Sequence, residues 1–111
     1  LRQLEDGVAE LALGVARRAV GDALAVHPEQ IRGLVREALE RVRRASVVRV
    51  RLHPADAALL DDLEVERVPD ATLARGDCVV ESDLGEVDAR LEVRLDAIRR
   101  ALEAGTGPAA R

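Results

Sequence analysis

The sequence predicts a single α+β domain in which helices cover a small sheet of about three strands. Three observations support this class. The chain has 111 residues, which is the length of one compact domain. Its apolar residues repeat at helical spacing near both ends and with a period of two in the middle. Pro and Gly separate these segments, so we expect the order helix, helix, strand, helix, strand, strand, helix.

The first two segments have the apolar spacing of helices. Residues 1–24 carry two adjoining apolar stripes, so this helix is expected to be buried on more than one side. Pro28 then starts a second helix, because Pro is favoured at the first helical position. Its apolar stripe begins at Ile31 and predicts a helix to about residue 44.

Gly7, Gly14 and Gly21 recur every seven residues in the first helix, and each costs up to about 1 kcal/mol there relative to Ala. They permit either a groove for another helix of this chain or a seam for self-association. The stripe beside them extends beyond what a small sheet can cover, so we predict self-association through this helix. Packing of the stripe on the second helix is the alternative. The stripe consists of Leu1, Leu4, Val8, Leu11 and Val15.

The apolar period changes to two after Ser46, where Val48, Val50 and Leu52 alternate with arginines. This alternation is typical of a half-buried strand. Pro54 starts a short helix to about residue 62, and a short strand is expected at residues 63–68. The third strand is expected at residues 78–82, followed by a turn and an extended or returning segment at 86–87.

The last helix is predicted from residue 88, where Asp88 can cap it, to the glycine at 105. Its apolar residues are spaced by four, four, three and four positions, so we expect them to form one buried face. They are Val87, Leu91, Leu95, Ile98 and Leu102. The domain is therefore expected to span residues 1–104, with a flexible tail at 105–111.

Composition excludes several classes of protein. The chain has 17 Arg or Lys against 21 Asp or Glu and contains no aromatic residue, which disfavours nucleic-acid binding by charge and by base stacking. No apolar stretch approaches the roughly 20 residues of a membrane span, so we expect no direct membrane insertion. The first residue is not Met, and we interpret the chain as a fragment of a longer protein.

No arrangement of residues predicts catalysis, a cofactor or a metal site. His27 and His53 each precede a Pro, and with a single Cys they give no zinc spacing. The acidic turn near residue 83 lacks the pattern of a calcium loop, and without Lys the chain has no P-loop. Cys78 lies in an apolar strand and is interpreted as a small core residue. A small enzyme that uses this thiol is a remote alternative, which slow alkylation would exclude.

Charge is unevenly distributed along the chain. Residues 61–88 hold ten acids against two arginines, whereas residues 41–51 hold five arginines and no acid. The strand alternation is expected to place Arg49 and Arg51 opposite the valine face, beside the arginines that end the second helix. This group is either a solvated surface or a patch that contacts an acidic or amphipathic partner segment. It consists of Arg41, Arg43, Arg44, Arg49 and Arg51.

Three segments resemble the FliH/SctL family of flagellar and type III secretion stator proteins. Residues 76–92 (GDCVVESDLGEVDARLE) resemble its GGCVVETDxGxVDAxLETQL signature, residues 11–22 (LALGVARRAVGD) its ALxIARKVIG helix, and residues 48–56 (VRVRLHPAD) its VxVRVHPxD turn. Arg75, Ser82 and Arg94 stand where the signature has Gly, Thr and Gln. The matching residues, which we interpret as mainly structural, include Gly76, Cys78, Val79, Val80, Glu81, Gly85, Val87 and Asp88.

The resemblance implies a non-enzymatic C-terminal stator domain. It implies a homodimer that binds the N-terminal region of the export ATPase and regulates it, in the cytoplasm beside the inner-membrane export apparatus. The resemblance also implies an N-terminal coiled-coil region that docks to the cytoplasmic ring or sorting platform. This region is expected to lie outside this chain. The fold is also similar to the C-terminal domain of the E-type stalk protein of rotary V/A-ATPases, so a peripheral-stalk subunit is the alternative. The sequence does not distinguish a flagellar from an injectisome system, or inhibition from activation.

Overall fold

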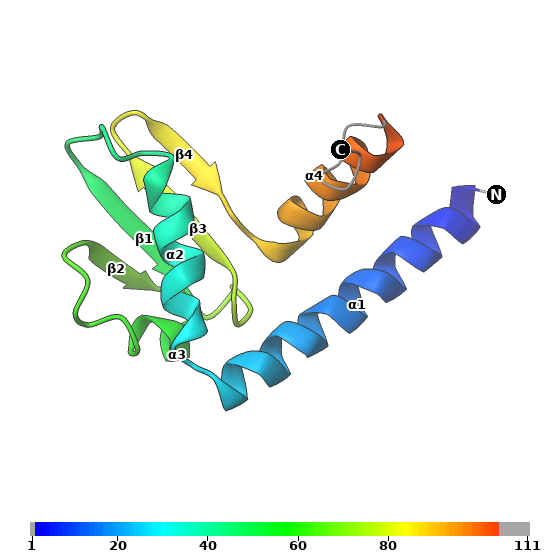
Figure 1. Ribbon diagram of the computed structural model, residues 1–111, viewed down its shortest axis with the longest axis horizontal. Helices are drawn as coiled ribbons and strands as arrows, with labels where there is room; N and C mark the ends of the chain where they lie inside the picture. The colour runs from blue at the N-terminus through cyan, green and yellow to red at the C-terminus, as the bar shows by residue number, and fades with distance from the viewer. Residues whose placement is uncertain (1, 105–111) are drawn as a thin grey trace.

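The computed structural model describes residues 2–104, which form four helices and four strands (Figure 1). The side chains of residues 2–5 are outside this description, and so are the expected tail at 105–111 and Leu1. The elements in order are α1 (Arg2–Val26), α2 (Gln30–Glu40), β1 (Val48–Leu52), α3 (Pro54–Ala57), β2 (Glu66–Pro69), β3 (Cys78–Ser82), β4 (Gly85–Asp88) and α4 (Leu91–Glu103).

The sheet is mixed and has the strand order β2-β1-β3-β4. Strand β1 pairs in parallel with β2 and antiparallel with β3, and β4 closes a hairpin onto β3. The predicted α+β class is confirmed, but the sheet has four strands rather than about three. The returning segment after residue 84 pairs fully with β3, because Gly85 takes a φ of +128° that few other residues tolerate and lets the chain reverse tightly.

Helix α2 covers one face of this sheet (Figure 1). Ile31 and Val35 on α2 are fully buried against Val50, Leu52 and Val80 on the two central strands. Burying such side chains stabilises the fold by about 1.5 to 3 kcal/mol each. The core is aliphatic, as the absence of aromatic residues from the sequence requires.

Three elements are shorter than the sequence predicts. Helix α2 ends at Glu40 because the next residues form tight turns, in which the Val42 amide donates to the Leu39 carbonyl at 3.0 Å. Helix α3 spans only residues 54–57, since the chain turns again and places Leu60 in the core at 1% exposure. Strand β2 begins at Glu66 rather than at residue 63.

Helices α1 and α4 lie beside each other and extend away from the sheet, with the N-terminal end of α1 near the C-terminal end of α4 (Figure 1). Helix α1 is anchored at its other end, where Leu24 enters the core. None of the residues of α4 is buried. The expected buried face from Val87 to Leu102 is therefore wrong: Val87 belongs to β4, Ile98 is 48% exposed and Leu102 is 59% exposed. Helix α4 faces α1 across a hollow, and only its first turn also lies near α2, where Arg94 lines a small hollow with Leu34 and Ala38.

The turn at residues 74–77 joins α1 to the rest of the fold. Gly76 has a φ of +87°, and a Cβ placed on it would lie 2.6 Å from a methyl group of Val20 on α1. Glycine is thus required here both for the backbone and for the close approach of the helix. The fully buried carboxylate of Asp56 holds the turn by accepting hydrogen bonds from Arg75 Nε at 2.6 Å and from the Gly76 amide at 2.8 Å.

Two isoleucine substitutions compare the core with the extended helices. Ile31→Ala should lower the free energy of unfolding by about 2 to 5 kcal/mol, because it leaves a cavity under α2. Ile98→Ala should lower it by less than about 1 kcal/mol, because half of that side chain is already in water. Urea unfolding followed by circular dichroism measures both, at a concentration where the chain is monomeric. Equal losses would contradict the placement of α4.

Candidate partner-binding surface

Helix α1 carries an apolar stripe that no other part of the described chain covers. Val8, Leu11 and Val15 lie on one side of the helix and are 59%, 69% and 62% exposed. Leu4 is at the next turn of the same stripe, but its side chain is outside the described residues. The alternative that this stripe packs on α2 is therefore wrong. Exposed apolar stripes of this kind mark contact surfaces for other proteins.

The three glycines of α1 also face open space. A Cβ placed on Gly7, Gly14 or Gly21 would meet no other atom within 4 Å. The interpretation that they form a groove for a helix of this chain is wrong, since no described helix approaches them. Beside Gly14 the missing side chain leaves a shallow hollow between Leu11 and Val15. Self-association at this seam stays a prediction.

A second hollow runs between the two extended helices. Its apolar lining comes from Ala9, Ala12 and Leu13 on α1 and from Leu95 on α4. The remaining lining residues are charged, with three acids and one arginine: Glu10, Glu92, Asp96 and Arg99. We call this hollow, together with the exposed stripe on α1 and the exposed Ile98 and Leu102 on α4, the arm surface.

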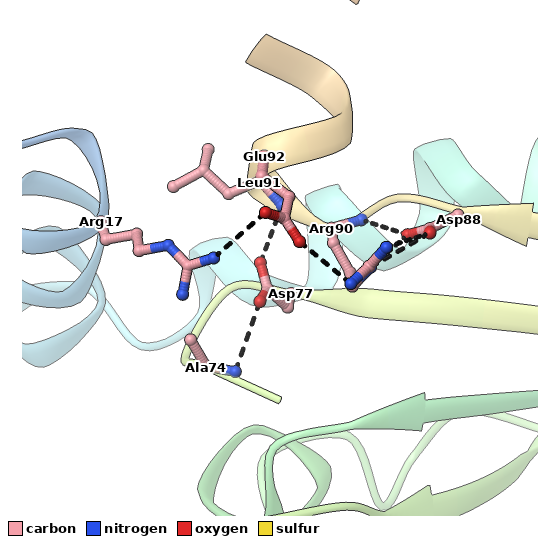
Figure 2. Close-up of polar contacts among 7 residues, drawn as sticks. All are labelled: Arg17, Ala74, Asp77, Asp88, Arg90, Leu91 and Glu92. Carbon is pink, nitrogen blue, oxygen red and sulfur yellow. Dashed lines mark hydrogen bonds and ion pairs between the residues drawn. The ribbon is translucent and has the colours of Figure 1, made fainter. Parts of the chain in front are cut away.

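A buried carboxylate fixes the start of α4 (Figure 2). Asp77 is 4% exposed, and its Oδ1 accepts a hydrogen bond of 2.8 Å from the Leu91 amide at the first residue of the helix. Its Oδ2 accepts from the Ala74 amide at 3.3 Å. The N-terminus of a helix favours a negative charge, because unpaired amides and the helix dipole point toward it. Asp77 therefore acts as the cap that the sequence pattern assigned to Asp88.

Asp88 has a different role at the same place (Figure 2). Its Oδ1 accepts from the Arg90 amide at 3.1 Å, and both of its carboxylate oxygens accept from the Arg90 guanidinium. These hydrogen bonds hold the pKa of the Asp88 carboxyl below its usual value. Arg90 also pairs with Glu92 at 3.0 Å, and Glu92 lies 3.9 Å from Arg17 on α1. A chain of charges thus connects the sheet, α4 and α1.

Removal of the cap should loosen α4 without unfolding the sheet. Asp77→Ala should lower the free energy of unfolding by about 1 to 2 kcal/mol and speed amide exchange in the first turns of α4. Hydrogen exchange read by mass spectrometry measures this change. Asp22→Ala, at an exposed position of α1, is the matched control and should change neither quantity. Unchanged exchange in α4 of the Asp77 variant would show that α4 is held by other contacts.

The five arginines predicted as one group are divided between two sides of the sheet. Arg49 and Arg51 project from the face opposite α2, whereas Arg41, Arg43 and Arg44 follow α2 on the covered side. The expectation that they lie beside one another is therefore wrong. A contact of either set with a partner stays a prediction.

Acidic side chains pair with the two strand arginines. The register of β1 against β3 places Glu81 directly across from Arg49, with Arg49 Nε at 3.0 Å from Glu81 Oε1. Arg51 lies 3.8 Å from Glu81 and 3.5 Å from Asp70. A sequence pattern within one strand does not show these partners, since they come from other segments. The positive charge of this face is thus largely balanced.

The family-signature residues mostly build the fold. Cys78 and Val80 lie in the core, Val79 is 2% exposed, and Val87 packs against the core from β4. Gly76 and Gly85 form the two turns with positive φ. Glu81 and Asp88 form the ion pairs described above.

Three carboxylates organise the fold through contacts that the sequence does not show, although Asp56 and Asp83 stand at Asp positions of the family motifs. Asp56 and Asp77 hold the turn at 74–77 and the start of α4, and Asp83 accepts hydrogen bonds from the Ser46 and Val47 amides, both at 3.0 Å. The Val47 hydrogen bond lowers the pKa of the Asp83 carboxyl. The partners that join these carboxylates to other elements are 14 to 37 positions away in the chain, so no local spacing could have identified these roles.

The chain offers little for catalysis in the part that the structure describes. Cys78 is 1% exposed, and burial raises the pKa of its thiol to about 11. His53 Nδ1 accepts the Ala55 amide and so caps α3. Among the described side chains, no three His, Cys, Asp or Glu gather as a metal site. No helix within residues 2–104 is long and apolar enough to cross a membrane.

The Cys78 thiol should react slowly in the folded protein. With a pKa of about 11, only about a thousandth of it is thiolate at pH 8. Iodoacetamide should therefore modify the folded chain at least about 100-fold more slowly than the chain in urea. Mass spectrometry of timed samples gives both rates. Rapid modification without urea would contradict the burial and revive the thiol-dependent alternative.

The fold and its exposed surfaces define a helix-armed α+β domain with apolar stripes available for protein contacts. Residues 1–98 match the family model described as flagellar assembly protein FliH. The chain belongs to the FliH family, which confirms the resemblance found in the sequence. It is 29% identical over 118 aligned positions to the type 3 secretion system stator proteins of Yersinia enterocolitica and Yersinia pestis. The alignments cover 96% of this chain and 52% of each relative, so the chain spans about half the length of these proteins.

Proposed function

We propose that this chain is the stator domain of a type III protein export apparatus, where it holds and regulates the export ATPase without catalysing a reaction itself. The observation that carries the proposal is the family match over residues 1–98. The name of the Yersinia relatives, type 3 secretion system stator protein, supports it. The domain works in the cytoplasm at the edge of the export apparatus. Docking to the cytoplasmic ring is assigned, on the resemblance alone, to an N-terminal coiled coil outside this chain.

The domain acts as a homodimer joined through α1. Val8, Leu11 and Val15 follow the spacing of a helix-pairing stripe, and about three-fifths or more of each side chain is exposed in the single chain. The glycines beside them put no side chain in the way of a second helix. Pairing of two copies would bury these stripes, and this apolar burial is the main driving force for protein association.

Two valine substitutions of similar exposure test the dimer. The chain should have a dimer mass at high micromolar concentration in light scattering. Val15→Asp should reduce it to the monomer mass, because a charge would be buried in the seam. Val47→Asp, at a 67% exposed position outside the arm surface, should leave the dimer intact. A monomer mass for the unmodified chain would overturn the dimer.

The N-terminal region of the export ATPase binds the part of the arm surface that the dimer leaves open, which is the hollow between α1 and α4 together with Ile98 and Leu102. The hollow between α1 and α4 offers apolar side chains with acidic groups around them, and Ile98 and Leu102 continue the apolar surface on α4. Arg49 and Arg51 are poorer candidates, because Glu81 and Asp70 already balance their charge. Apolar contacts are thus expected to provide most of the affinity, with charge setting the association rate.

Leucine substitutions at two exposed sites test this contact with the export ATPase of the same organism. Leu102→Asp should weaken ATPase binding at least about tenfold, whereas Leu84→Asp, on the β3–β4 turn, should have no effect. The rates of association and dissociation are measured with the chain immobilised on a surface and the ATPase in solution. Arg49→Glu with Arg51→Glu should leave the association rate and its salt dependence unchanged. If that double variant associates more slowly and with less salt dependence, the ATPase contacts Arg49 and Arg51 on the sheet face instead.

A further inference from the structure

We propose that the hollow beside α2 binds an acidic segment of a protein partner that carries a large apolar anchor residue. This hollow lies on the body of the domain, over the start of β1 and the segment that enters β2. None of its lining residues belongs to the arm surface, so the inference does not depend on the dimer or on the ATPase contact.

The floor of the hollow is aliphatic. Leu39, Val42 and Ala45 come from the end of α2 and the turns after it, while Val48 and Val65 come from the sheet side. The hollow has a volume of about 350 Å³, which is at the lower end of the roughly 300 to 1,000 Å³ that is usual for binding pockets. It is open to solvent and can therefore receive a side chain from another protein.

The rim of the hollow is charged, and its cations are poorly neutralised. Arg36 and Arg43 stand on the rim with Glu40. Arg43 pairs with Glu40 at 3.9 Å, with both side chains about 70% exposed, which makes a weak pair. Arg36 and Arg44 have no ion pair among the described side chains.

Charge complementarity selects the occupant. Residues 36–44 hold four arginines and two glutamates, so this end of α2 is positive in a chain whose net charge is −4. An acidic segment would gain from the rim, and an apolar anchor would gain from the floor. A nucleic acid is disfavoured, because the hollow has no aromatic side chain for stacking and carries Glu40 on its rim. Arg49 and Arg51 on the sheet do not offer the same free positive charge, since acidic residues of the same chain already pair with them.

Three matched peptides test the proposal by fluorescence anisotropy with the full chain. The first is an amphipathic peptide with leucines at helical spacing and glutamates between them. The second replaces the glutamates by lysines, and the third replaces the leucines by serines. The first should bind, and its affinity should fall as salt is raised. The second and third should bind at least about tenfold more weakly.

Paired variants locate the site on the protein. Arg36→Glu with Arg43→Glu should weaken binding of the first peptide at least about fivefold, and both positions are exposed, so the fold should be retained. Arg18→Glu with Arg100→Glu is the matched control on the extended helices and should change binding less than about twofold. Amide chemical shifts should change at residues 39–48 and 65. No binding up to about 1 mM, equal binding of the lysine peptide, or shifts confined to the arm surface would overturn the proposal.

Discussion

The turn at residues 74–77 is the constraint on which the rest of the structure depends. The buried carboxylate of Asp56 holds it from α3, and Gly76 leaves room for Val20 of α1 to pack directly on it. Asp77 then caps α4 from the same turn. A buried carboxylate is costly unless its hydrogen bonds are satisfied, and the Gly76 amide and Arg75 satisfy those of Asp56. One short segment thus sets the position of both extended helices relative to the sheet.

The core that stabilises the fold and the exposed apolar surface lie in different parts of the molecule. Its stability comes from the aliphatic core between α2 and one sheet face, where Ile31, Val50 and Leu52 are fully buried. The extended helices contribute little burial of their own, and α4 contributes no buried residue. Their apolar side chains therefore remain available to other proteins at little cost to the fold. The proposed stator role needs this combination, since such a domain must stay folded while it presents apolar surface to a partner.

Charges are arranged differently on the two sides of the sheet. On the uncovered face, cross-strand pairing brings Glu81 to Arg49 and Arg51, so the face is largely balanced. Beyond α2, Arg36 and Arg43 flank an apolar hollow without comparable neutralisation. Two arginines on each side thus give either a neutralised surface or one that stays positive, depending on whether the tertiary structure brings acidic side chains to them.

The sequence by itself determined the α+β class, the extent of α1, the positions of β1 and β3 and the family. These depend on local periodicity, on Pro and Gly, and on three short motifs along the chain. Tertiary structure alone decided three other features. Residues 85–88 form a fourth strand only because they pair with β3. The charge of the sheet face depends on which acidic residues the cross-strand register places beside the arginines. The start of α4 is capped by Asp77, which lies 14 positions earlier in the chain. The apolar spacing of α4 correctly predicted a helix with one apolar side. It could not show whether that side meets the core or a second protein, because burial depends on where the helix points and not on its sequence.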